Sequence, residues 1–321
     1  MTYNSETGGD EMKEAAALPR GGRHRAPLRA LPAMDLPFLV LVLTLVGFGL
    51  VMLGSASGAV ALYRRGDAFA YLRPQLLYAA MGIAGLWLAS RVDYHIFHKL
   101  AWPLLGVSLM LLEPHLSGTL LILGIGAVLM FVGGTGLRWF VLAGVGGAAA
   151  IGAAVVVMPD LVPYAADRLR SWQDPFADPL GDGHQTIQSL YAIGSGGATG
   201  LGLGNSRQKH LFVPEPQNDF IFSIVCEELG FVGACAVVLL FVLLLWRGIT
   251  IAAHAPDRFG ALLVVGFTVQ VALQAVLNVA VVTNTIPNTG ISLPFFSSGG
   301  TSLMMLLGEM GIVLSVSRGE T

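Results

Sequence analysis

The sequence predicts an all-α polytopic membrane protein with about eight transmembrane helices and one large extracytoplasmic loop. Hydrophobic residues make up 54% of the 321 residues and charged residues only 12%, about half the charged share of a soluble domain. The mean hydropathy of +0.70 is too high for a single buried core. Lipid is therefore the expected solvent for most of the chain. A net charge of −2 without a basic face argues against a nucleic-acid-binding protein.

Eight apolar segments are candidates for membrane-spanning helices. A span needs about 20 apolar residues, because a rise of about 1.5 Å per residue must cross about 30 Å of hydrocarbon. The candidates lie at residues 37–54, 74–90, 100–112, 116–133, 139–158, 220–246, 259–283 and 300–317. The third has only 13 residues and is too short to cross the membrane unaided.

Residues 1–36 form a polar leader with glycines and arginines, which predicts a disordered cytoplasmic tail. A cleaved signal peptide is the alternative, because the small residues at 55–58 follow the first apolar run. The leader is too long and the apolar run exceeds a usual signal-peptide core, so we expect a retained anchor. Residues 37–318 then form the transmembrane domain.

The distribution of basic residues predicts that both termini face the cytoplasm. With eight spans and the amino end inside, the inner segments hold ten arginines and lysines within about 20 residues of a span, and the short outer segments hold three. This asymmetry follows the positive-inside rule. Omitting the weak third span would place Arg247, Arg258 and Arg318 outside. The same topology places residues 159–218 outside the membrane, as a loop too long to be a mere connector.

Acidic residues mark the start of the sixth apolar segment. Asp219 precedes it, and Glu227 and Glu228 lie about two helical turns deeper. Polar groups inside a span are costly unless they are paired or line a watered cavity. These acids therefore predict either a functional cavity or a structural hydrogen-bonded pair that packs helices together.

Amide side chains recur every four residues in the seventh segment, at Gln270, Gln274 and Asn278, so they share one helix face. Such a face lines a cavity or joins two helices through amide hydrogen bonds, and both interpretations stay open. Glu309, alone in the last segment, is expected to be paired structurally.

Two irregular segments fall on the predicted outer side. GGATGLGLG (196–204) looks superficially like a phosphate cradle, but a nucleotide loop needs a βαβ unit that the sequence does not supply. Its glycines are instead expected to allow a tight turn in which the chain re-enters the membrane. Residues 284–302 mix prolines, glycines and hydroxyls, and irregular backbone at membrane depth is tolerated only beside protein or a watered cavity. We expect these outer loops to meet over one site, the alternative being an ordinary turn.

Two long segments resemble the SEDS family, the shape, elongation, division and sporulation proteins FtsW, SpoVE and RodA. They run from GDGHQTIQ to EELGFVG (181–233) and from NTIPNTG to LLGEMG (284–311). The motif PEPQNDFIF (214–222) is more similar to the FtsW and SpoVE branch than to RodA. The resemblance implies a bacterial plasma-membrane glycosyltransferase that polymerises lipid II into peptidoglycan during cell division. The implied partners are a class B penicillin-binding protein, other divisome proteins and membrane lipid.

Candidate site residues follow from the resemblance and from the chemistry of the residues themselves. The family's essential acid lies in the motif that reads Asn-Asp-Phe here, which implies Asp219 as the catalytic general base. Five polar side chains are predicted to line a cavity: Glu227, Glu228, Gln270, Gln274 and Asn278. Predicted substrate contacts are Arg168, Arg170, Gln185, Arg207, Lys209, Glu215, Ser298, Gly299, Gly300 and Thr301. Arginine suits bidentate contact with pyrophosphate, although a solvated loop or lipid headgroups would also explain the basic residues.

No cofactor is firmly implied. A divalent cation, Mg²⁺ or Mn²⁺, could share the work, with unknown ligands.

The chain departs from the family's ten-span pattern. It passes from AWPLLGVS (101–108) directly into LMLLEPHLSG (109–118), and a Gln-Pro-Ser-Glu motif of the family is absent. The short third span looks like a splice of the family's third and fifth spans, and the loss of two spans preserves the orientation. The alternatives are a lipid II flippase, for which the internal repeats of a transporter are not seen, and an inactive scaffold that recruits division partners.

Overall fold

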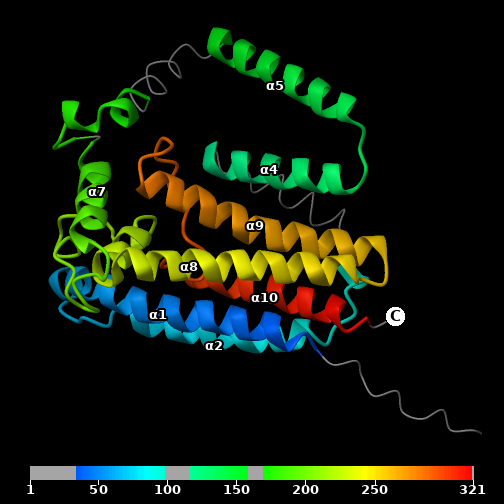
Figure 1. Cartoon of the computed structure of the whole chain (residues 1–321), viewed down its shortest axis with the longest axis horizontal. Helices are drawn as coiled ribbons and strands as arrows, with labels where there is room; N and C mark the ends of the chain where they lie inside the picture. The colour runs from blue at the N-terminus through cyan, green and yellow to red at the C-terminus, as the bar shows by residue number, and fades with distance from the viewer. Residues whose placement is uncertain (1–33, 98–115, 158–168, 182, 320–321) are drawn as a thin grey trace, which may run out of the picture. The chain divides into compact units, whose positions relative to one another are not determined.

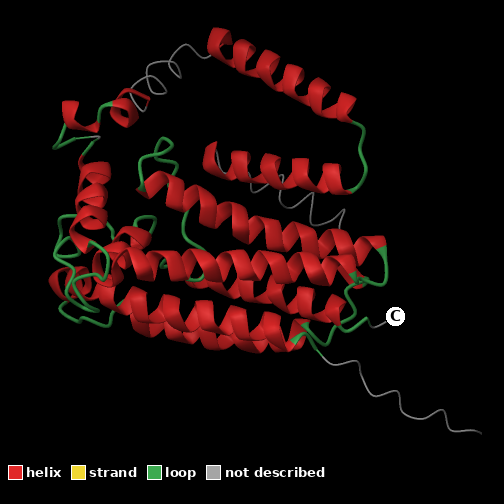
Figure 2. Ribbon diagram, in the orientation of Figure 1, coloured by secondary structure: helices red, strands yellow, loops and turns green. Residues whose placement is uncertain are grey.

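The computed structural model describes residues 34–97, 116–157, 169–181 and 183–319, and this part of the chain contains helices and no strand (Figures 1 and 2). Its helices are α1 (Leu36–Arg65), α2 (Leu72–Ala89), α4 (Leu116–Val132), α5 (Leu137–Val157), the 3-10 helix η2 (Pro175–Ala177), α7 (His184–Gly196), α8 (Ile221–Ala253), α9 (Arg258–Val282) and α10 (Gly300–Ser317). The all-α prediction is confirmed. The predicted span at 100–112, most of the predicted tail and Arg168 lie outside the described residues.

Four helices among the described residues, α1, α8, α9 and α10, are long and apolar enough to cross a membrane. Shorter apolar stretches lie in α4 and α5, at Leu121–Val132 and Leu137–Gly147. These lengths fit a polytopic membrane protein, while the total of eight spans stays a prediction. The described part of the predicted outer loop contains α7, which packs on α8.

Helix α1 is longer than the predicted first span. It continues through residues 55–58 to Arg65, and Gly66 then ends it with a left-handed backbone at φ 69°. The predicted span at 37–54 therefore lies within a longer helix. Ala56 and Ser57 are buried, so these small residues allow close helix packing rather than ending the helix.

The helix ends that the topology places on one side of the membrane do lie together. Arg247 forms an ion pair with Asp35, with Nη2···Oδ2 at 2.7 Å. The Asp35 N–H donates to Ser317 Oγ at 3.3 Å, and Ser315 Oγ donates to the Val92 carbonyl at 2.6 Å. The Tyr94 hydroxyl donates to Asp257. These contacts join the start of α1, the end of α8, the end of α10, the segment after α2 and the start of α9. The relative up-and-down order of these five helices therefore agrees with the prediction.

Helix α8 is broken at Gly230, whose φ of 66° and ψ of −168° are essentially restricted to glycine. The glycine-rich segment 196–204 fits against this break. Backbone hydrogen bonds of 2.9 to 3.1 Å pair Leu201 with Glu227, Gly202 with Glu228, Phe231 with Gly197, and Val232 with Ala198. A Cβ atom at Gly200 would lie 2.2 Å from the Glu228 carbonyl oxygen. These glycines therefore permit a close approach of two backbones.

Candidate active site

Asp219 lies immediately before the helical segment of α8, at the end opposite the Arg247–Asp35 pair. The residue is half-buried. Burial raises the pKa of its carboxyl above the usual range, a backbone hydrogen bond opposes this rise, and the nearby carboxylate of Glu215 adds to it. A partly desolvated carboxylate at the mouth of a helix bundle has the properties that a general base requires.

The two outer loops meet at Asp219, as predicted. The Ser298 N–H donates to the Gln217 carbonyl at 2.8 Å, and Ser297 Oγ donates to the Asn218 carbonyl at 2.7 Å. The Ser298 hydroxyl also contacts the Asn218 side chain. Gly290, in the same loop as Ser297 and Ser298, lies beside the Asp219 carboxyl group. Its φ is 69°, and a Cβ atom there would lie 3.5 Å from Asp219 Oδ2. The polypeptide between α9 and α10 therefore forms one wall beside the carboxyl group.

Helices α1 and α7 also hold the motif that leads to Asp219. Arg64, in the last turn of α1, forms an ion pair with Glu215, which also accepts a bond from Gln217 Nε2 at 2.6 Å. Gln185 of α7 donates to the Pro214 carbonyl at 3.4 Å and accepts from Asn288 at 3.3 Å. Sequence reasoning missed Arg64 as a site neighbour. Its only signal was a basic residue on the predicted outer side.

Glu227 and Glu228 lie in a polar cluster in which neither side chain is exposed. Glu227 accepts from the Ser206 hydroxyl and from the Arg207 N–H at 2.9 Å. Glu228 accepts from Ser55 Oγ at 2.7 Å and from Lys209 Nζ at 2.8 Å. Lys209 is only 6% exposed and also donates to the Gly204 carbonyl at 2.7 Å. These surroundings match the structural alternative: the cluster joins α1, α8 and the loop between α7 and α8.

The three amides of α9 have different surroundings. Gln270 Nε2 lies 3.2 Å from Glu309 Oε2 on α10, which confirms that Glu309 is structurally paired. Gln274 lines a cavity of about 20 Å³ that is also bordered by Ser292, Ser297, Ser298 and Ser302. Asn278 is fully buried and donates to the carbonyls of Asp219 at 2.6 Å and Ile291 at 2.7 Å. Gln270 therefore joins α9 to α10, and Asn278 supports the Asp219 site at the other end of α9.

The other predicted substrate contacts lie in different surroundings. Gly299, Gly300 and Thr301 form the start of α10, next to Ser298. The side chain of Arg207 is exposed, and Arg170 lies at a separate cavity of about 170 Å³ beside Asp174 and Asp178. The structure thus brings Asp219, Glu215, Ser298 and Asn278 together and places Lys209 in the buried cluster. The roles of these residues in substrate binding stay predictions.

A divalent cation has no evident ligand set in the part of the chain that the structure describes. No group of three or more His, Cys, Asp or Glu side chains is arranged there to hold a metal ion. The proposed Mg²⁺ or Mn²⁺ therefore stays a prediction without assigned ligands.

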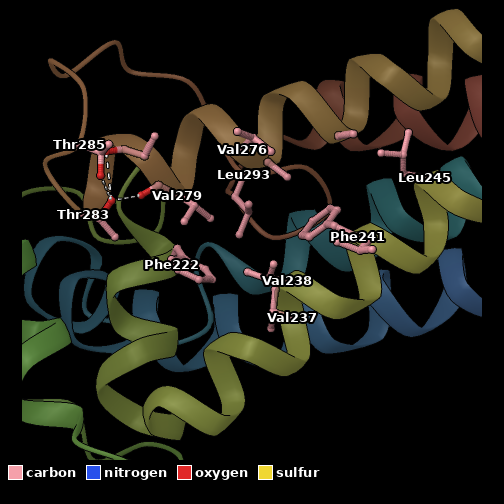
Figure 3. A pocket seen from close by; sticks show the side chains of 14 residues that line it. Phe222, Val237, Val238, Phe241, Leu245, Val276, Val279, Thr283, Thr285 and Leu293 are labelled. Atoms are coloured by element: carbon pink, nitrogen blue, oxygen red, sulfur yellow. Dashed lines mark hydrogen bonds between the residues drawn. The ribbon is translucent and has the colours of Figure 1, made fainter.

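An apolar groove of about 340 Å³ lies between α8 and α9 (Figure 3). On α8 its lining extends from Phe222 to Leu245, and on α9 it includes the small residues Ala272, Ala275 and Ala280. Thr283 and Thr285 lie at one end, where their hydroxyls are 2.9 Å apart. Leu293 also lines the groove, so the groove borders the loop that covers Asp219.

Comparison with known proteins places the chain in a family. The sequence profile of the FtsW, RodA and SpoVE family, described as cell cycle proteins, matches residues 35–113 and 95–321. The chain belongs to this family. Stage V sporulation protein E of Bacillus subtilis is 35% identical, over 88% of this chain and 97% of that protein. A probable peptidoglycan glycosyltransferase FtsW of Trichlorobacter lovleyi is 33% identical, over 92% of this chain and 96% of that protein.

Solved structures of the FtsW, RodA and SpoVE family have the same fold. A chain of a peptidoglycan synthase complex that coordinates polymerization and crosslinking matches with a TM-score of 0.71 and 28% identity, over 89% of this chain and 98% of that chain. An aspartate-to-alanine mutant of the rod shape determining protein RodA of Thermus thermophilus matches with a TM-score of 0.55 and 27% identity, over 89% and 98%. Family membership and the long apolar helices together identify a bacterial membrane protein.

The chain is internally shorter than its family relatives. The alignment with the Bacillus subtilis protein has 358 positions, whereas 88% of 321 residues is about 282, so about 76 aligned positions have no residue here. The two matches to the family profile share residues 95–113, the stretch in which the sequence predicts the junction of the third and fifth spans. The overlap and the missing positions support this predicted junction.

Proposed function

We propose that this chain is a peptidoglycan glycosyltransferase that polymerises lipid II during cell division, with Asp219 as its general base. The observation that carries the proposal is the half-buried Asp219 carboxyl, held where two loops meet at one end of the bundle. Family membership and relatives named as probable peptidoglycan glycosyltransferases support it.

The proposed reaction is a single in-line displacement with inversion. The C4 oxygen of the acceptor sugar bonds to the anomeric carbon of the donor, and the bond between that carbon and the pyrophosphate oxygen breaks. Asp219 takes the proton of the acceptor hydroxyl, and the pyrophosphate leaves as an anion on its undecaprenyl chain. An α-linked donor then gives a β-1,4 product without a covalent intermediate, as in inverting glycosidases.

The leaving pyrophosphate is best accommodated near the start of α10. A helix amino terminus offers unpaired N–H groups and a partial positive charge to an anion. Gly299, Gly300 and Thr301 form this terminus, and Ser298 joins it to the Asp219 loop. The exposed Arg207 is the basic residue that we propose to reach the same anion from the loop before Asp219.

The positive-inside distribution supports an orientation with Asp219 on the outer side of the plasma membrane and both termini in the cytoplasm. Lipid-linked sugar precursors would then reach the site from the outer leaflet. The Arg247–Asp35 end of the bundle would face the cytoplasm.

We propose that the groove between α8 and α9 receives the membrane helix of a class B penicillin-binding protein. The α8 lining from Val237 to Leu245 covers roughly 12 Å along a helix, and Phe222 continues it beyond the break at Gly230. The alanines of α9 leave room for another backbone, as small residues do at helix contacts in membranes. A solved relative that is part of a peptidoglycan synthase complex supports such a partner.

Filling the groove is expected to weaken this partnership. Val276 lines the groove and is 64% exposed, so Val276→Trp adds bulk there without disturbing the core. Co-purification should show at least about tenfold weaker binding of the penicillin-binding protein. Leu239→Trp is the matched control, because Leu239 is 56% exposed on α8 outside the groove. Equal binding by the two variants would exclude the groove as the docking surface.

The proposed function is tested by reconstituting the chain with lipid II and its cognate penicillin-binding protein. A polymerase makes glycan strands, whereas a flippase moves lipid II between leaflets without making any. A scaffold binds the partner and makes no glycan. In that case, insertion of a family-like segment after Val107 should restore synthesis if the internal shortening is the cause.

A further inference from the structure

Three consecutive carbonyl groups at the candidate active site are held by donors from distant parts of the chain. The carbonyls of Gln217, Asn218 and Asp219 accept from Ser298 N, Ser297 Oγ and Asn278 Nδ2 at 2.8, 2.7 and 2.6 Å. None of these bonds depends on the side chain of residue 219. The backbone that carries the carboxyl is therefore fixed at three successive points.

The side chain of Asn278 donates to two backbone carbonyl groups. Its side-chain nitrogen also donates to the Ile291 carbonyl at 2.7 Å, so one amide joins both outer loops to α9. Both partners are carbonyl oxygens, which fixes the orientation of the amide, because only its nitrogen can donate. The opposite atom, Oδ1, is buried without a hydrogen-bond partner among the described residues. An unpaired buried acceptor destabilises a fold, which a residue serving packing alone would avoid.

We infer that Asn278 is a positioning residue that fixes the Asp219 carboxyl against the loop at Gly290. This inference rests on the proposed role of Asp219 as the general base. The amide ties residue 219 to residue 291, and Gly290 is the position whose Cβ would lie 3.5 Å from Asp219 Oδ2. A base acts efficiently only when the reacting atoms are held about 3–3.5 Å apart, and a displacement of about 1 Å can cost about 100-fold in rate.

The test compares Asn278→Ala with Thr268→Val in the reconstituted complex. Thr268 is a buried polar residue of the same helix, and its hydroxyl donates to the Val264 carbonyl one turn earlier in α9. Asn278→Ala should lower kcat by about 10- to 100-fold and change the KM for lipid II by less than about twofold, because the substrate contacts remain. Thr268→Val should keep both constants.

The pH profile shows whether the bond from Asn278 affects the surroundings of the Asp219 carboxyl. Without the amide the carboxyl becomes better solvated, so the acid limb of the rate profile should move to lower pH. Ser297→Ala removes the donor to the Asn218 carbonyl together with the acceptor of the Leu293 N–H, and should move the limb in the same direction. This second variant reports on the inference even if Asn278→Ala does not fold.

The outcomes separate this inference from the proposed function. An unchanged kcat and an unchanged acid limb in Asn278→Ala overturn the positioning role, provided that Asp219→Asn is inactive. If Asn278→Ala does not fold, an unchanged profile in Ser297→Ala overturns it. Parental activity in Asp219→Asn would instead overturn the general base itself.

Discussion

Replacement of Asp219 by asparagine is expected to lower the rate of lipid II polymerisation by about 10²- to 10⁴-fold, the usual contribution of a general base. Asparagine has nearly the same size but cannot accept the proton of the acceptor hydroxyl. The variant should fold normally, because Asn278 holds residue 219 through its backbone carbonyl. The measurement is the initial rate of glycan formation by the purified complex.

Asp67→Asn provides the matched control for this substitution. Asp67 lies between α1 and α2, on the same side of the bundle, and pairs with Arg73 at 2.8 Å. Its carboxylate accepts from the Phe69 N–H and from Arg73, both in the segment that follows α1, so its variant should polymerise at the parental rate. The general-base assignment is wrong if Asp219→Asn matches this control.

Loss of the Glu228 carboxylate is expected to produce the largest change in stability. Glu228→Leu keeps a similar volume but leaves the ammonium of Lys209, only 6% exposed, without its counter-charge. Removing one partner of a buried ion pair typically costs about 3–5 kcal/mol. The free energy of unfolding in detergent should fall by this amount.

A double-mutant cycle shows whether the ion pair is the cause. Adding Lys209→Met to Glu228→Leu removes the stranded charge, so the double variant should regain most of the lost stability. If the loss of stability in the double variant equals the sum of the losses in the two single variants, Glu228 and Lys209 stabilise the fold independently.

The long helices could be predicted from sequence because the bilayer dictates their length and polarity. The apolar runs at 259–283 and 300–317 correspond closely to α9 and α10. The end of α1 could not be predicted from hydropathy. Residues 55–58 interrupt the apolar run, but Ser55 bonds to Glu228 on another helix. Hydropathy alone cannot distinguish a packing contact of this kind from the end of a helix.

The candidate site was partly predictable for a related reason. Asp219 is conspicuous as an acid at the mouth of a span, whereas Glu227 and Glu228 are equally conspicuous but serve the packing of a loop. Their partners lie about 20 residues earlier in the chain, and sequence spacing does not reveal that loop's path. The break at Gly230 was missed because it depends on backbone bonds to the glycine-rich segment.

The pH dependence of polymerisation tests most directly the claim that the ionised Asp219 carboxylate takes the proton. Burial raises the pKa of this carboxyl, and the charge of Glu215 adds to the rise. The rate should therefore fall as the pH drops through a value above about 3.9, the ordinary pKa of aspartate. Glu215→Gln removes a like charge and should move this acid limb to lower pH. A rate that stays constant to about pH 4, or a limb that Glu215→Gln does not move, would contradict the account.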